Sequence, residues 1–467
     1  MGGLSKKAFQ IQQLGIGQRL LLDSGNLLFK RSPIAPGVNQ TRLTAEAIID
    51  IYQDLHYDAV GVGPLDLAGG LEFLRQSKER GFPWVSANLF DDKQNPLFPQ
   101  WIRREKGKTE IFVTAISAAA PQMAGDFQIK SWKSVLPGLL QRIKTESKEP
   151  FIILLSTLSD EENRLIAEKH PDIHLLIGGD QRKGNISPRI VDTTLLTQTS
   201  KQGKYQGLIE IQLGRQRQWV KDAAKELAEL QNRLGSVNWQ FKRLEKKAST
   251  PGSANTFTAP MERLRKEIET LETAITSAAK RVETEKTGGI TGDLYNSRLI
   301  ELKSSMPDDP AISRKLAELR QRIRKLHGNR KVAALQRGML GNNGCDTCHP
   351  TQTAFWKETD HAQAYTTLVD KEKNLDLDCL PCHLTRDLQN PSLPMAQSTA
   401  LLAFPAELRG VGCESCHGAG QKHGEAPEQV KLVLRPGKET CLTCHSDEHD
   451  DDFNYDLKLP QISCPAG

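Results

Sequence analysis

The spacing of hydrophobic positions changes twice along this chain. Up to about residue 215, short runs of branched apolar residues alternate with stretches of helical spacing. Strands are predicted at residues 19–23, 58–62, 84–87, 110–114, 151–155 and 173–177, with helices between them, for example at 44–54 and 70–80. This alternation predicts an α/β layered domain over residues 1–215, with any chemistry on its loops.

From about residue 221, apolar residues recur at alternating spacings of four and three. One run extends from Ala223 to Leu244 and a second from Met261 to Ala278. This heptad pattern predicts two coiled-coil-like helices, as an antiparallel hairpin or an oligomer seam. A third helix is predicted from Ile312 to Leu326. Residues 216–330 are therefore predicted to be a helical spacer, in which the three helices could cover one another, or else a partner-binding rod.

Residues 331–467 contain four copies of the pattern C-x-x-C-H. The copies are Cys345, Cys348 and His349; Cys379, Cys382 and His383; Cys413, Cys416 and His417; and Cys441, Cys444 and His445. This pattern is the attachment signature of c-type haem: two thiols bond to the porphyrin and the histidine becomes the proximal iron ligand. CxxC pairs also bind zinc, but zinc does not require a histidine after every second cysteine. We therefore predict four covalent haem c groups.

The second axial position of each iron decides between electron transfer and substrate binding. Four more histidines lie in or near this region: His327, His361, His423 and His449. Each is a candidate distal ligand or a surface residue. His327 ends a predicted helix, where a cation also suits the helix dipole. His449 lies in an acidic run at 447–452, where a salt-bridged surface histidine would be natural.

The spacing around the first and third motifs resembles a known family. The chain reads C-x-x-C-H-P-x5-W-x4-H-A at 345–362 and G-C-E-S-C-H-G-A-G-x-x-H at 412–423. Both runs are similar to the tetrahaem cytochrome c family that accepts electrons from hydroxylamine oxidoreductase, and the resemblance covers about 345–455. It implies that His361 ligates the third haem and His423 the first, in a stacked pair. It also implies one five-coordinate haem.

The N-terminal blocks resemble the calcineurin-like metallophosphoesterase fold of periplasmic 5′-nucleotidases and UDP-sugar hydrolases. The blocks follow the family's order at residues 2–4, 22–26, 57–63, 86–89, 155–158 and 177–180. The resemblance implies a site for two metals, held by Asp, Asn and His, that generates hydroxide for hydrolysis. The family's first strand, which carries Asp-x-His, would lie before Met1.

The positions that this resemblance assigns to metal ligands depart from the family pattern. Asn26 replaces a bridging Asp, the G-N-H-E block reads G-P-L-D at 63–66, Thr157 replaces a His, and the closing G-H-x-H block reads G-D-Q-R at 179–182. Proline and leucine cannot bind a divalent cation. Only Asn26 and Asp180 could ligate. We therefore expect no divalent metal here and a catalytically inactive pseudoenzyme that serves as scaffold or docking module.

Composition and charge limit the classes of partner and the cell compartment that we expect for this protein. The chain has 467 residues, a formal net charge of +5 and 6% aromatic residues, without a basic block interleaved with aromatics, so nothing favours nucleic acid. No apolar run of about 18 residues predicts a transmembrane helix. The start of the chain does not resemble a signal peptide, yet bacterial haem attachment takes place outside the cytoplasm. We therefore expect a leader upstream of Met1, and a periplasmic, outer-membrane-associated or extracellular protein.

The sequence as a whole favours a multihaem c-type cytochrome that carries electrons, rather than an enzyme. Its expected partners are other cytochromes or quinol-linked oxidoreductases, and the heptad helices could join protomers into a homo-oligomer. Cys464 is expected to be a free thiol near the tail. Two enzymatic alternatives stay open: redox catalysis on a small nitrogen or sulfur compound at a five-coordinate haem, and residual 5′-nucleotidase-type hydrolysis.

Overall fold

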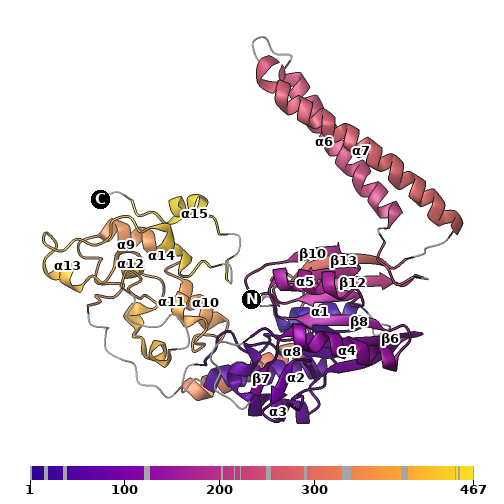
Figure 1. Ribbon diagram of the computed structural model, residues 1–467. Helices are drawn as coiled ribbons and strands as arrows, with labels where there is room; N and C mark the ends of the chain where they lie inside the picture. Colours follow the sequence, from indigo (N-terminus) through magenta and orange to yellow (C-terminus); the bar gives the residue numbers. More distant parts are fainter. Residues whose placement is uncertain are drawn as a thin grey trace.

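The computed structural model describes most of the chain. The described residues are 3–14, 19–34, 39–119, 127–200, 203–214, 216–220, 222–248, 254–288, 292–328, 338–390, 398–446, 449–450 and 453–465. Figure 1 shows an α/β layered part, a long helical hairpin that projects from it, and a C-terminal part built of short helices. Among the described helices, none is long and apolar enough to cross a lipid bilayer.

The main sheet lies in the N-terminal part. Its strands, in spatial order, are β10 (Ile186–Val191), β11 (Thr194–Gln198), β9 (Leu175–Gly178), β8 (Phe151–Ser156), β6 (Thr109–Ile116) and β5 (Trp101–Lys106). The inner strands β11, β9, β8 and β6 pair in parallel, whereas β10 and β5 pair antiparallel. Every residue of β8 is buried, as expected for a central parallel strand covered on both faces.

Further strands and helices complete the layers. A second parallel sheet contains β1 (Leu22–Asp23), β2 (Ala59–Gly61) and β3 (Trp84–Val85), and β4 (Leu89–Asp91) pairs with β7 (Phe127–Ile129). The helices are α1 (Leu4–Gln13), α2 (Asn39–Asp54), η1 (Asp66–Gly69), α3 (Leu71–Glu79), α4 (Trp132–Glu146) and α5 (Asp160–Lys169). Phe112 packs into one core with Leu136 of α4, and the next residue, Val113, packs into another. The predicted α/β layers are therefore confirmed.

His174, just before β9, should make these layers sensitive to acid. Its Nδ1 accepts a hydrogen bond from the Ile152 amide at 3.1 Å, and burial, helped by the charge of Arg217, lowers the pKa of His174 to about 4. The unfolded chain therefore binds a proton first, near its ordinary pKa of about 6.5. We expect the free energy of unfolding to fall by roughly 1–2 kcal/mol between pH 7 and pH 5 because of this group.

Urea unfolding of the wild type and of His174→Asn at pH 7 and pH 5 checks this expectation. Asparagine keeps an acceptor oxygen for the Ile152 amide but does not titrate. The variant should therefore lose less stability than the wild type between the two pH values. Equal losses in the two proteins would contradict the assignment.

Two long helices form an antiparallel hairpin, which is one of the arrangements that the heptad pattern predicted. They are α6 (Ala223–Ala248) and α7 (Ala254–Gly288), and they pack against each other (Figure 1). Arg233 pairs with Glu267 at 2.7 Å, and Arg281 of α7 pairs with Glu226 near the start of α6. Association of protomers through this hairpin stays a prediction.

After the hairpin, the chain returns to the N-terminal layers. Strand β13 (Leu294–Glu301) pairs antiparallel with β12 (Tyr205–Gln212), from one end to the other. Helix α8 (Pro310–His327) packs on α2 and α1, and its Ile312 joins the core that contains Ala8 and Ile49. The arrangement in which the three helices cover one another therefore does not hold for α8, because its apolar face packs on α1 and α2. The domain boundaries at 215 and 330 remain predictions.

The C-terminal part consists of short helices joined by irregular segments, as predicted. The helices are α9 (Pro350–Lys357), α10 (Ala364–Asp370), α11 (Leu380–His383), η3 (Thr399–Ala403), η4 (Ala406–Leu408), α12 (Cys413–His417), α13 (Gln421–Glu425), α14 (Lys438–Leu442) and α15 (Tyr455–Ile462). A small apolar cluster around Leu377, Leu380 and Leu408 lies within this part. The third motif lies in α12, the second at the start of and within α11, the first directly before α9, and the fourth begins in α14.

Candidate functional sites

Three of the four motif histidines are oriented by a hydrogen bond from Nδ1 to an oxygen. The bonds run from His383 to the Ala364 carbonyl (2.6 Å), from His417 to the Val433 carbonyl (2.5 Å) and from His445 to the Asp450 carboxylate (2.7 Å). Because the acceptors are oxygens, Nδ1 carries the proton and Nε2 keeps a lone pair. Histidines that bind metal almost always have such a partner on the other nitrogen. These three side chains therefore fit a role as iron ligands.

His423 lies opposite the histidine of the first motif. Its Nδ1 donates to the Val430 carbonyl at 2.7 Å, and its ring centroid is 6.3 Å from that of His349, with the two planes 19° apart. Metal–imidazole bonds of about 2 Å place two ring centroids about 6 Å apart when the rings lie on opposite sides of one metal. The two rings are thus spaced to hold one iron between them, in agreement with the ligand pair implied for the first haem.

His361 contacts a different motif from the one that the resemblance implied. Its ring centroid lies 6.0 Å from that of His445 in the fourth motif. The backbone of His361 does lie beside the third motif, since its carbonyl accepts from the Val411 amide at 2.9 Å. The ring contact nevertheless favours the fourth haem. Burial, followed by the neighbouring His445, lowers the pKa of His361 and favours the neutral ring that a metal binds.

The cysteine side chains bring motifs together in pairs. None of the nine cysteines is in a disulfide. The neighbouring Cys413 raises the pKa of Cys345, and the neighbouring Cys382 raises the pKa of Cys444, so these side chains lie close together. The first motif therefore touches the third, and the second touches the fourth. Burial raises the pKa of Cys379 to about 12, which keeps that thiol neutral. Such contacts fit closely packed haems, including the predicted pair of the first and third.

The remaining candidate histidines are not brought to a motif histidine. His327 is 3% exposed at the end of α8, and His449 is exposed, with its amide donating to the Ser446 carbonyl. Within the described ranges, neither ring is in contact with a histidine of the four motifs. Their roles as ligands stay predictions.

In the N-terminal layers, Asp66 organises the loops at the ends of β1 and β2. Its carboxylate is fully buried and accepts hydrogen bonds from the backbone amides of Asn26, Leu27, Leu28 and Gly63, at 2.7–2.8 Å. Burial raises the pKa of Asp66 to about 7, although the amides of Gly63, Leu28 and Asn26 oppose that change. The sequence indicated an acidic residue at this position but not its contacts, because they join loops nearly 40 residues apart.

The two side chains that could still bind a metal are already engaged within the protein. The Asn26 Oδ1 accepts a hydrogen bond from the Leu65 amide at 2.9 Å. The Asp180 carboxylate accepts from the Arg182 guanidinium at 3.1 Å and from the Asp160 amide at 3.1 Å, and Arg182 lowers the pKa of Asp180. A divalent metal would have to replace these partners and would meet the positive charge of Arg182. The residues present therefore do not fit a two-metal centre.

Replacing Asp66 by asparagine should destabilise these loops. Whichever way the new amide turns, its NH₂ group faces two backbone amides that each need an acceptor. Leaving buried donors unsatisfied costs about 1–3 kcal/mol each, so we expect a loss of about 2–4 kcal/mol in the free energy of unfolding. Urea unfolding followed by far-UV circular dichroism measures the loss. Asp92→Asn, at an exposed position, is the control and should change little; equal midpoints for both variants would refute the role given to Asp66.

Comparison with known proteins finds that the C-terminal part is similar to a cytochrome. Residues 344–418 match the family model described as cytochrome c554 and c-prime. Cytochrome c-554 of Nitrosomonas europaea is 29% identical over 116 residues, which cover 21% of this chain and 47% of that protein. The chain thus spans about half the length of this curated relative. The predicted resemblance is confirmed, and the match supports a multihaem cytochrome with covalent haem c.

Solved structures that resemble this chain include 5′-nucleotidases, as the N-terminal blocks predicted. A 5′-nucleotidase precursor from Thermus thermophilus is 14% identical, with a TM-score of 0.45, over 71% of this chain and 55% of that chain. The sulfate thiohydrolase SoxB of Thermus thermophilus is 19% identical, with a TM-score of 0.39, over 46% and 40%. With TM-scores of 0.45 and 0.39, these likenesses carry no argument about the activity of this chain.

Proposed function

We propose that this protein is a c-type cytochrome with four haems that carries electrons in a bacterial cell envelope. The observation that carries the proposal is that motif histidines pair with His423 and His361 at the ring spacing of two ligands on one iron. Haem, once bound, supplies the one-electron chemistry of its iron. The eight motif cysteines would hold the porphyrins as thioethers, and His349, His383, His417 and His445 would be the proximal ligands.

The side chains around these histidines have a defined task in this function. An oxygen that accepts from Nδ1 fixes the ring plane and raises the basicity of Nε2. Asp450 does this for His445 with a full negative charge, whereas His383 and His417 rely on backbone carbonyls. We therefore infer that the fourth haem has the most electron-rich proximal ligand and a lower reduction potential than it would have with a carbonyl partner.

We propose that the N-terminal layers are an inactive phosphoesterase-like scaffold or docking module without a divalent metal. The internal hydrogen bonds of Asn26 and Asp180 support this proposal, as does the Arg182 charge at the former ligand position. Metal analysis and a phosphatase assay with added Mn²⁺ test it. Hydrolysis that depends on manganese would overturn it and would favour residual 5′-nucleotidase-type activity.

The expected partners are other cytochromes or quinol-linked oxidoreductases, and the expected compartment is the periplasm or the outer face of the envelope. The cytochrome match supports both expectations. We further propose a homo-oligomer joined through α6 and α7, which sedimentation analysis tests. Sedimentation as a monomer at every concentration would remove it.

Redox catalysis at an open haem is a second candidate function. Among the described residues, a second histidine ring is in contact with His349 and with His445, but not with His383 or His417. An iron with one free axial position could bind a small nitrogen or sulfur compound. Binding of nitric oxide or cyanide to one iron of the reduced protein would favour this candidate.

Haem analysis of the exported protein tests the main proposal. We expect four irons per chain, a reduced α-band typical of c-type haem, and covalent haem that resists acid–acetone extraction. A purified protein that is colourless, or that contains zinc in place of iron, would contradict the proposal.

A further inference from the structure

A loop of the C-terminal part docks on the N-terminal layers directly before the second haem motif. This docking loop, residues 371–378, ends one residue before Cys379. Its partners lie on the segment after β1, on α2 and on α8, which are remote in sequence. The contact is therefore a candidate route by which the α/β layers act on one haem.

Gln40, near the start of α2, holds the loop with both ends of its side-chain amide. Its Nε2 donates to the Asp376 carboxylate at 2.6 Å, and its Oε1 accepts from the Leu377 amide at 3.1 Å. Gln40 is 3% exposed, and Leu377 is completely buried. A buried amide that satisfies both a donor and an acceptor is costly to remove, because the Leu377 amide would lose its acceptor and the Asp376 carboxylate one of its donors.

Asp376 links this contact to the haem motif. The carboxylate oxygen that accepts from Gln40 also accepts from the Asp378 amide at 3.0 Å, and the Asp376 carbonyl accepts from the amides of Cys379 and Leu380, both at 3.0 Å. Asp376, which Gln40 holds, therefore accepts a hydrogen bond from Leu380, the first residue of helix α11, and this helix carries Cys382 and His383. A shift of Asp376 would move the attachment turn and the proximal histidine together.

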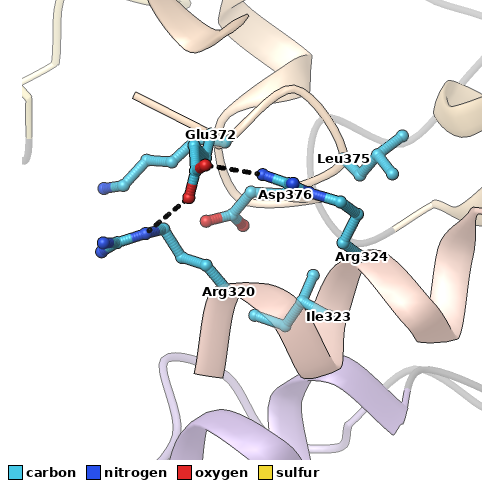
Figure 2. A pocket seen from close by; sticks show the side chains of 7 residues that line it. Arg320, Ile323, Arg324, Glu372, Leu375 and Asp376 are labelled. Carbon is cyan, nitrogen blue, oxygen red and sulfur yellow. Dashed lines mark ion pairs between the residues drawn. The ribbon is translucent and has the colours of Figure 1, made fainter. Parts of the chain in front are cut away.

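Ion pairs surround the same loop. Figure 2 shows Glu372 between Arg320 and Arg324 of α8, with ion pairs of 3.9 and 3.4 Å. Glu372 has a φ of 54°, in the left-handed region that is unfavourable for a residue other than glycine. Lys30 adds a pair to Asp378 at 3.5 Å. Exposed ion pairs of this kind each contribute little to stability. The buried Gln40 contact therefore contributes more than they do to holding the loop in place.

We propose that Gln40 is a positioning residue for the second haem motif, through which the α/β layers set the environment of one haem. This inference rests on the proposed function, and it gives the scaffold a specific task. The orientation of a proximal histidine and the burial of its haem are among the factors that set reduction potential. His383, with its Nδ1 fixed on the Ala364 carbonyl, would change orientation if the turn before it were released.

The test uses the full-length protein with its haems attached, and compares Gln40→Ala with Gln53→Ala. Gln53 is on the same helix, and its Nε2 donates to the Arg80 carbonyl at 2.8 Å, within the N-terminal layers. Spectroelectrochemical titration should show four reduction steps in each protein, with one step shifted in Gln40→Ala and none shifted in the control. Hydrogen–deuterium exchange of residues 372–384 should become faster in Gln40→Ala alone.

Two results would overturn the proposal: unchanged potentials of all four haems, or a common shift of all four, which would indicate general loosening. If Gln40→Ala does not accumulate with its haems, Gln40→Glu, which keeps an acceptor for the Leu377 amide but loses the donor to Asp376, is judged by the same two results. A wild-type protein without haem would instead contradict the proposed function itself, so the two failures are distinguishable.

Discussion

Replacing Cys379 and Cys382 together by serine should leave this protein with three haems in place of the four that we propose. A hydroxyl group does not form the thioether that fastens the porphyrin, and without attachment His383 alone would hold the iron weakly. The second motif is suited to this experiment because both of its cysteines lie at one short helix, Cys379 directly before α11 and Cys382 within it. Iron content and c-type haem absorbance should each fall by about a quarter.

Cys464→Ser is the matched control for this loss. Cys464 is an exposed thiol outside the four motifs, and its replacement should leave all four haems in place. Four irons in the double variant would show that the second motif does not bind haem. Loss of every haem would show that attachment at one motif depends on the others, which also contradicts independent sites.

Replacing His361 by alanine should convert one low-spin haem into a high-spin haem that binds external ligands. The ring of His361 is placed to fill the sixth position of the iron that His445 holds, and alanine leaves that position open. Electron paramagnetic resonance of the oxidised protein should show a new high-spin signal, and carbon monoxide should bind to one reduced iron. His170→Ala, in the N-terminal layers, is the control and should change neither.

Motif variants identify the haem that His361 serves. If His361 serves the fourth haem, Cys441→Ser with Cys444→Ser should abolish the new high-spin signal of His361→Ala. Cys413→Ser with Cys416→Ser should leave that signal in place. The opposite result would restore the assignment to the third haem, which the family resemblance implied, and would contradict the ring contact with His445.

The sequence predicted the N-terminal layers well because their signals are local. The central strand β8, for example, is a run of apolar, mostly branched residues that can be recognised without reference to distant contacts. The attachment motifs are similarly local, since two cysteines and a histidine lie within five residues. The two-helix hairpin also follows from a repeat within its own sequence.

The parts that could not be predicted depend on partners far away in the chain. The apolar face of α8 has a helical period, but that period does not reveal that α1 and α2 cover it. The Gln40 contact joins residues 336 positions apart, and glutamine carries no pattern that indicates such a bond. The sequence shows Asp450 only as one of several acidic residues in a run. The structure shows that Asp450, five residues after His445, lies beside that ring and accepts its hydrogen bond.

The base of the helical hairpin gives the fold an unusual freedom. Strands β12 and β13 pair antiparallel along their whole length. The chain therefore leaves the layers after Gln212 and returns at its partner Leu294, which lies beside it. Helix α7, with 35 residues, extends about 50 Å from that base. Removing whole heptads from both helices would bring the tip closer without changing how the layers pack, so the reach of this arm can vary independently of the rest of the protein.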